Sequence, residues 1–115
     1  MKEQIFAKLK IKNITLKNRF VVSPMCQYSS RNGNPVKWHY NHLLNLANSG
    51  AGLLMIEATA VSKKGKITHS DMSLTNVENF KNLKKLTNFI KKNSDIKIGL
   101  QISHSGRKGS AELPW

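Results

Sequence analysis

The segment at residues 52–58 constrains the fold more than any other part of the chain. Its residues are apolar on both alternating faces up to Glu57, a pattern typical of a parallel strand that is covered on both sides. Two further strands are predicted. One spans residues 19–24, where Pro24 ends the run, and the other spans residues 96–102, where apolar residues alternate with polar residues or glycine.

Two amphipathic helices are predicted between these strands. The first runs from Trp38 to Asn48, and Gly50 is placed to end it as a left-handed cap. The second follows the capping-box spacing of Thr75 and Glu78 and runs to about residue 93. Its predicted apolar face contains Val77, Phe80, Leu83, Leu86 and Ile90. Two successive right-handed crossovers make a parallel sheet almost unavoidable.

A short hairpin is predicted before the first strand, because two alternating apolar and polar stretches flank the turn-prone pair at residues 12–13. Its apolar positions are Leu9, Ile11, Ile14 and Leu16. The order of a hairpin followed by β-α-β-α-β leaves both a closed barrel and a doubly wound sheet open. A Rossmann fold is disfavoured, since residues 23–28 contain no glycine for a phosphate-binding turn. With 115 residues the chain is too short for two ordinary domains.

The charge balance is strongly basic: 19 lysines and arginines against 6 acidic residues give a formal net charge of +13. Such an excess attracts polyanions, so a basic module that binds polyanions or nucleic acid without catalysis is an alternative function. Nearly all the basic residues are lysines spread along the chain, whereas base and phosphate recognition favours arginine. A nucleic-acid partner is therefore disfavoured.

Other features are typical of a cytoplasmic protein. The single cysteine, Cys26, excludes an internal disulfide and fits a reducing compartment. No run approaches the roughly 18 apolar residues of a membrane helix, and residues 1–6 lack the apolar stretch of a secretory signal. We therefore expect cytoplasmic localisation and no membrane partner.

The carboxyl ends of the three predicted strands carry the candidate site residues, because loops there are free to vary and helix N-termini point toward a ligand. The first end has Pro24, Met25, Cys26 and Tyr28; the second has Glu57, Ala58 and Thr59; the third has Gln101, His104, Arg107 and Lys108. This mixture of a thiol, a phenol, an amide, a small residue and cations suits a flat heteroaromatic ring with polar edges. It provides no metal site.

Two local features have a plainer interpretation. His39 and His42 are three residues apart on a predicted helix, but no third ligand of cysteine or carboxylate type lies nearby in the sequence. A packing or capping role is therefore favoured for this pair. Cys26 has no general base assigned by the local sequence, so a nucleophilic role is not indicated.

Five segments in register with these strand ends resemble the Old Yellow Enzyme family of FMN-dependent NADH:flavin oxidoreductases, closest to its bacterial NADPH dehydrogenase and xenobiotic reductase branch. They are residues 17–29 (KNRFVVSPMCQYS), 38–42 (WHYNH), 50–61 (GAGLLMIEATAV), 65–67 (GKI) and 101–108 (QISHSGRK), with Pro114 and Trp115 after the last. The resemblance covers essentially the whole chain. It implies part of a TIM (β/α)8 barrel whose bottom is closed by the hairpin.

The resemblance also implies roles for individual residues. The residues implied to contact FMN are Ser23, Pro24, Met25, Cys26, Ala58 and Gln101. Cys26 would tune the flavin through a hydrogen bond, Gln101 would reach its pyrimidine part, and Tyr28 would orient the carbonyl oxygen of the substrate. Lys108 would lie near the same mouth. The implied reaction is hydride transfer from NAD(P)H to FMN, and then to the β-carbon of an activated alkene such as an enone.

The chain departs from the family pattern in two ways. Residues 71–75 (DMSLT) replace the usual Asp-Leu-Gly-Ile-Trp type segment, which leaves the local loop packing open. A barrel of this kind takes about 250 residues, and only three of its eight strands are predicted here. We therefore expect residues 1–115 to be the amino-terminal part of an FMN-binding domain, inactive alone. Its open strand edges favour association with a missing barrel portion or with further copies of the chain.

Overall fold

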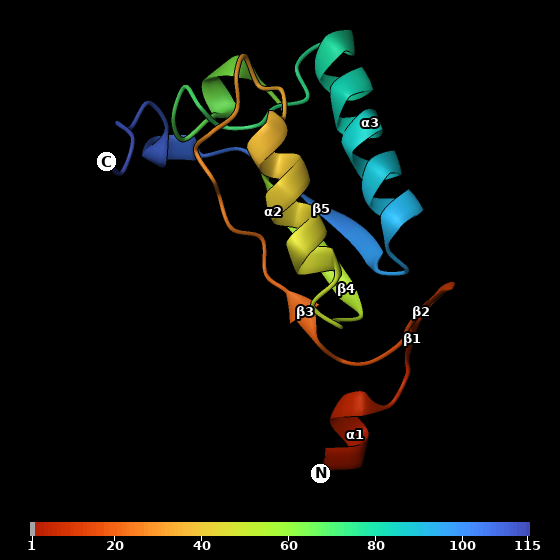
Figure 1. Ribbon diagram of the computed structural model, residues 1–115. Coiled ribbons are helices and arrows are strands. Elements are labelled where there is room, and N and C mark those ends of the chain that lie inside the picture. The colour runs from red at the N-terminus through yellow and green to blue at the C-terminus, as the bar shows by residue number, and fades with distance from the viewer. Residues whose placement is uncertain (1) are drawn as a thin grey trace.

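A computed structural model describes residues 2–115; Met1, the first residue of the segment considered for a secretory signal, lies outside the described residues. The elements are α1 (Lys2–Phe6), β1 (Leu9–Ile11), β2 (Ile14–Leu16), β3 (Val21–Val22), α2 (Lys37–Ala47), β4 (Leu53–Ala60), η1 (Lys63–Gly65), α3 (Val77–Asn93), β5 (Lys97–Ser103) and η2 (Gly106–Lys108). The predicted order of a hairpin followed by β-α-β-α-β is confirmed (Figure 1). Within residues 2–115, no helix has the length and apolar character needed to cross a membrane.

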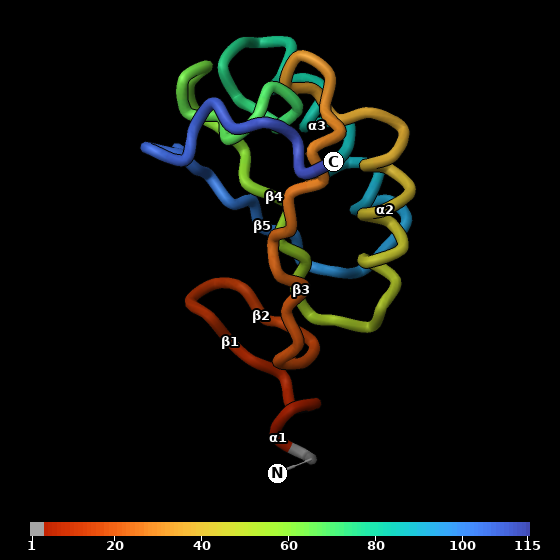
Figure 2. The backbone as a smooth tube through the Cα atoms, turned by 90° about the vertical axis from the view of Figure 1, so that its left-hand side faces the viewer, coloured from red at the N-terminus to blue at the C-terminus, as the bar shows by residue number. Residues whose placement is uncertain are grey.

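β4 is the central strand of a three-stranded parallel sheet with the order β3-β4-β5. Val21 pairs with Leu53, and Leu53 pairs with Lys97, so all three strands run in one direction, as predicted. α2 and α3 cover the same face of this sheet (Figure 1, Figure 2). The antiparallel hairpin β1-β2 lies near the start of the sheet strands, and a hollow of about 690 Å³ between them is lined by Ile14 and Gly99, among others.

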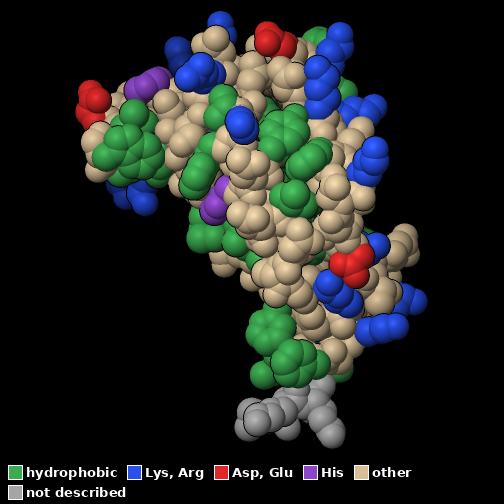
Figure 3. Space-filling model, viewed as in Figure 1, with side chains coloured by type: hydrophobic (Ala, Val, Ile, Leu, Met, Phe, Trp, Pro, Cys, Tyr) green, Lys and Arg blue, Asp and Glu red, His purple; other side chains and the backbone are tan. Residues whose placement is uncertain are grey.

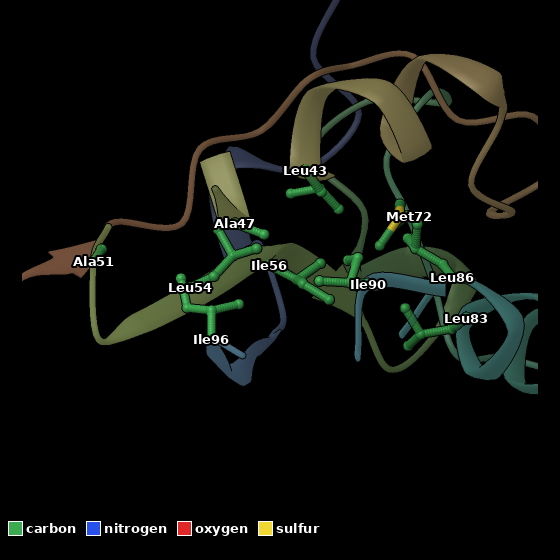
Figure 4. Packing of buried hydrophobic residues seen from close by; sticks show 10 residues of the cluster. All are labelled: Leu43, Ala47, Ala51, Leu54, Ile56, Met72, Leu83, Leu86, Ile90 and Ile96. Atoms are coloured by element: carbon green, nitrogen blue, oxygen red, sulfur yellow. The ribbon is translucent and has the colours of Figure 1, made fainter. Parts of the chain in front are cut away.

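The hydrophobic core lies between the sheet and the two covering helices (Figure 4). Leu54 and Ile56 of β4 and Leu86 and Ile90 of α3 are all fully buried. The rest of this core consists of Leu43, Ala47, Ala51, Met72, Leu83 and Ile96. Full burial of one such aliphatic side chain contributes about 1.5–3 kcal/mol relative to leaving it exposed. This layer is therefore the main source of stabilisation. The apolar positions predicted for the last three turns of α3 are confirmed, because Leu83, Leu86 and Ile90 are buried there.

The first turn of α3 differs from the prediction. Val77 and Phe80 belong to the predicted apolar face, but they are 69% and 58% exposed. Asn79 is buried in this turn instead, where its side chain donates to Asn32 O (3.0 Å) and accepts from the Ser73 hydroxyl (3.2 Å). The predicted apolar positions are wrong here because this turn packs against polar loops rather than against the sheet.

The predicted capping box of Thr75 and Glu78 is also wrong. The N-cap is Asn76, which has the extended backbone of an N-cap and accepts a hydrogen bond from the Asn79 N–H (2.8 Å). The Thr75 hydroxyl donates instead to Asn79 Oδ1 (3.1 Å), and Glu78 accepts from the side chain of Asn34 (3.3 Å). Both predicted capping residues therefore bond to side chains and not to the helix backbone.

The strand boundaries shift by a few residues. β3 contains only Val21–Val22 of the predicted residues 19–24, and Pro24 stays outside the ladder because it has no N–H to donate. β4 runs two residues beyond the prediction, since the Ala60 N–H donates to Met72 O (2.9 Å) and Ala60 O accepts from the Leu74 N–H (2.8 Å). These bonds lengthen β4 at its carboxyl end.

The end of α2 is close to the prediction but is capped differently. The helix spans residues 37–47 rather than 38–48, and Asn48 is the C-cap residue. Gly50 has a φ of 90°, in the left-handed region that favours glycine, but it lies two residues beyond the cap. Its conformation therefore serves the turn that leads into β4.

Candidate functional site

The carboxyl ends of the sheet strands lie at the end of the molecule where η1, η2 and the loops after the strands gather (Figure 1, Figure 2). The β4–β5 register shifts between Ile56 and Thr59. Two residues of β4, Glu57 and Ala58, therefore stand opposite the single residue Gln101 of β5. Such bulges re-aim side chains and are frequent beside active sites. The predicted site residues Ala58 and Gln101 are thus neighbours across the ladder.

Cys26, in the segment after β3, lies at the same edge. Its thiol is half-buried, and burial raises its pKa above the usual value. The negative charge of Glu57 raises the pKa further, Asp71 adds a smaller contribution, and the main-chain N–H of Ala58 acts in the opposite direction. Cys26 therefore lies beside Ala58, which in turn stands across the ladder from Gln101.

The rest of the segment after β3 carries the other residues predicted to contact a ligand. Ser23 and Met25 are exposed, and Pro24 is half-buried. The side-chain amide of Gln27 donates to Met25 O (2.9 Å), which fixes a short turn around Cys26. The structure thus presents this run as a surface at the carboxyl end of the sheet; contact with a cofactor stays a prediction.

Glu57 is buried at the centre of this edge, 3% exposed. Its Oε2 accepts from the main-chain N–H of Gln27 (3.1 Å), and its Oε1 lies 3.2 Å from Nε2 of His39. The sequence places Glu57 at a strand end but does not show this central position. The available signal is a carboxylate inside an otherwise apolar strand, because a buried charge needs partners in space.

The two histidines of α2 have local roles. The Val36 N–H donates to Nδ1 of His39 (3.0 Å), which supports the predicted capping role. The ring of His42 stacks on Trp38, with centroids 5.4 Å apart and planes 11° apart. Within residues 2–115, no three His, Cys, Asp or Glu side chains gather in a way that could hold a metal ion.

Tyr28 adopts a φ of 49°, in the left-handed region that bulky residues rarely occupy. Such backbone strain persists where the surrounding structure holds it, and it clusters at functional sites. The ring of Trp115 contacts Tyr28 edge-on, with centroids 6.1 Å apart. Burial, followed by the charges of Cys26, Asp71 and Glu57, raises the pKa of the Tyr28 phenol. The sequence alone did not reveal this contact with Trp115.

Lys108 lies in η2, on a rim formed by two loops that are bonded together. The Ser105 N–H donates to Gly65 O (2.9 Å), and the Ala111 N–H donates to Ile67 O (2.8 Å). Lys108 is exposed, and its side chain forms no hydrogen bond or ion pair with another residue of the described part of the chain. Its placement near a substrate therefore stays a prediction.

Residues 4–114 match the family described as NADH:flavin oxidoreductase / NADH oxidase. The NADPH dehydrogenase of Bacillus cytotoxicus is 44% identical over 115 residues, which cover 98% of this chain and 32% of the relative. NADH:flavin oxidoreductase FG08077 of Gibberella zeae is 41% identical over 112 residues, 97% of this chain and 27% of the relative. The chain thus spans about a third of the length of these curated relatives.

Solved structures share the fold. Morphinone reductase superposes with a TM-score of 0.82 at 21% identity, over 91% of this chain and 27% of that protein. A 2-naphthoyl-CoA reductase complex superposes with a TM-score of 0.85 at 27% identity, over 95% of this chain and 17% of that protein. The old yellow enzyme from Trypanosoma cruzi has a TM-score of 0.83 at 23% identity, over 93% of this chain and 28% of that protein.

Proposed function

Because the chain belongs to the NADH:flavin oxidoreductase / NADH oxidase family, we propose that it forms the amino-terminal part of an FMN-dependent NAD(P)H oxidoreductase of the ene-reductase type. Its fold is that of the amino-terminal part of an Old Yellow Enzyme TIM barrel. FMN, when bound, would supply the redox chemistry, which is hydride transfer from NAD(P)H to the β-carbon of an activated alkene. Residues 1–115 would contribute one side of the flavin site.

The residues at the sheet edge fit one side of an isoalloxazine ring, which is flat, largely apolar and polar along one rim. Ala58 would leave room for the ring, because its side chain is a single methyl group. Gln101, across the bulge, would bond the pyrimidine part through its carboxamide, and Cys26 would approach from the side of β3. The position of Ala58, beside Cys26 on one side and across the ladder from Gln101 on the other, is the observation that supports the proposal.

Two side chains at this edge are suited to donate hydrogen bonds at neutral pH. The raised pKa of Cys26 keeps its thiol protonated, so it would donate to the flavin rather than attack a substrate. The raised pKa of Tyr28 keeps its phenol protonated, so its O–H would orient a substrate carbonyl. Lys108 would add a cation at the mouth. Each of these residues would therefore bind the flavin or orient the substrate, and none of them would carry the hydride.

The charge distribution does not favour the alternative of a polyanion-binding module. Lys and Arg side chains are scattered around the visible face instead of forming one patch (Figure 3). The lysines of α3 line its outer side, where a solvated helix face is the ordinary explanation (Figure 3).

The proposal is tested by titrating FMN with the purified 115-residue chain and following the flavin fluorescence. We expect weak binding and no NADPH oxidation by the chain alone. Gln101→Ala should weaken FMN binding by about tenfold, because an amide that bonds a ligand is worth about 1–1.5 kcal/mol. Asn88→Ala, which removes an exposed carboxamide on α3, is the matched control. Equal FMN affinity for both variants would remove Gln101 from the flavin site.

A further inference from the structure

Gln27, the residue directly after Cys26, is fixed at three atoms. Its main-chain N–H donates to Glu57 Oε2 (3.1 Å), and its side-chain Oε1 accepts from the indole N–H of Trp38 (3.0 Å). Its Nε2 donates to Met25 O (2.9 Å), which closes the turn on the other side of Cys26. The main chain next to Cys26 is therefore held by the Glu57 carboxylate of β4 and by the Trp38 indole in the first turn of α2.

His39, in the same turn of α2, contacts Glu57 from the opposite side. It is fully buried, and its Nδ1 accepts from the Val36 N–H, so the proton of the neutral imidazole lies on Nε2. Nε2 is 3.2 Å from Glu57 Oε1, but the N–H is not aligned with that oxygen, and no other residue of the described chain bonds it. A buried donor requires a partner, and the Glu57 carboxylate is the group within reach.

We propose that Glu57 is a positioning residue of the site: held between His39 and the Gln27 N–H, it fixes the turn at residues 25–27 and keeps a buried negative charge beside the Cys26 thiol. Nothing in the proposed redox chemistry needs a carboxylate at this place. Glu57 is buried, so it is not placed to contact a substrate. Its role is exerted through Cys26.

The charge of Glu57 has a consequence for the protonation of the thiol. Burial is the main cause of the raised pKa of Cys26, and Glu57 is the largest charged contributor. Asp71, from the loop before α3, adds a smaller repulsion, and the Ala58 N–H partly offsets both. Glu57 thus favours the S–H form, the form that can donate a hydrogen bond. This role of Glu57 rests on the proposed function in one respect only, namely that the group facing the Cys26 thiol is a flavin.

The experiment is the pH profile of alkylation by iodoacetamide, with neither flavin nor NADPH present. Cys26 is the single cysteine of the chain, so the alkylation rate reports this thiol alone. In the wild type, the profile should have its midpoint at higher pH in buffer than in concentrated urea, where the thiol is free of its neighbours. Coincident midpoints in buffer and in urea would overturn the proposal before any variant is made.

Two variants separate charge from packing. Glu57→Gln keeps the shape and removes the charge, so its midpoint should fall and alkylation at pH 7.5 should be about threefold to tenfold faster. His39→Asn keeps an acceptor for the Val36 N–H and leaves the Glu57 charge with one donor fewer, so its midpoint should not fall. Glu78→Gln, which removes an exposed carboxylate on α3, should leave the profile unchanged.

The outcomes are distinct. Equal downward shifts in Glu57→Gln and His39→Asn would show that the pair acts only through packing, and the proposal would fail. If circular dichroism shows Glu57→Gln to be unfolded, the wild-type comparison in buffer and urea and the His39→Asn profile still decide. A chain that binds no FMN but shows the expected profiles would refute the proposed function and leave this inference standing.

Discussion

Both halves of β4 carry buried side chains, but their surroundings differ in chemistry. In the first half, Leu54 and Ile56 are enclosed by apolar side chains of the covering helices. In the second half, Glu57 and Thr59 are 3% and 1% exposed and are surrounded by hydrogen-bonding groups. Apolar burial is non-directional, whereas a buried polar group is costly unless its partner is correctly placed. The first half therefore stabilises the fold, and the second half fixes positions at the candidate site.

The largest loss of stability is expected from the apolar half. Ile90→Ala removes a fully buried side chain that belongs to the core beneath β4. The lost transfer energy and the resulting cavity should lower the free energy of unfolding by about 2–5 kcal/mol, measured by urea titration with circular dichroism. Val77→Ala, at a position that is 69% exposed on the same helix, is the control and should cost less than about 1 kcal/mol. Similar losses for both variants would contradict the placement of the core.

A somewhat smaller loss is expected at the polar anchor of α3. Asn79→Ala leaves the Asn32 carbonyl and the Asn34 side chain without the amide that bonds them at 3.0 and 2.8 Å. The variant also removes the oxygen that accepts from the buried Ser73 hydroxyl (3.2 Å), and the loss of these bonds should lower the free energy of unfolding by about 1–3 kcal/mol. Asn88→Ala, on the exposed side of the same helix, should have almost no effect. A loss at Asn79 larger than that at Ile90 would reverse the ranking of the two kinds of burial.

The apolar half could be predicted from the sequence because its signals are local. The double-sided apolar run of β4 and the three- and four-residue spacing of Leu83, Leu86 and Ile90 depend on backbone periodicity alone. The parallel direction of the strands then followed from the two successive crossovers. The same local argument failed for Val77 and Phe80, because the first turn of α3 lies over polar loops.

The polar half could be predicted only in part. Strand ends predicted that Ala58 lies near Cys26 and Gln101, because parallel strands bring their carboxyl ends to the same edge. The contacts of Glu57 with Gln27 and His39 join three segments that are distant in the sequence. No periodicity encodes such pairings, since they depend on how loops and a helix end meet in space. Family resemblance supplied roles for the surface of the site, but not this buried support.

Two glycines provide a finer test of the comparison, because one lies just before β4, the other lies in η1 beyond its carboxyl end, and each has close neighbours. A Cβ at Gly52, before β4, would lie 2.6 Å from the main-chain oxygen of Asn18. A Cβ at Gly65, in η1, would lie 2.8 Å from Cδ2 of His104, a side chain that can turn away. Gly52→Ala should therefore cost about 1–2 kcal/mol of unfolding free energy, and Gly65→Ala less. Urea titration of both variants checks the order, and a larger loss for Gly65→Ala would contradict it.

The smallest effect is expected at the ion pair between Lys17, after the hairpin, and Asp95, before β5. Their side chains are 2.8 Å apart and are 38% and 78% exposed, so water and salt screen the pair. The Lys17 hydrogen bond and charge lower the pKa of Asp95 below its ordinary 3.8. A depressed folded-state pKa gives stability that is present above the unfolded pKa and is lost as pH falls through the folded pKa. The small urea-midpoint difference between wild type and Asp95→Asn should therefore disappear on acidification below pH 3.8 and shrink in high salt. A difference that persists in acid would mean that Asp95 contributes through packing, as the side chains in the apolar half of β4 do, and not through its charge.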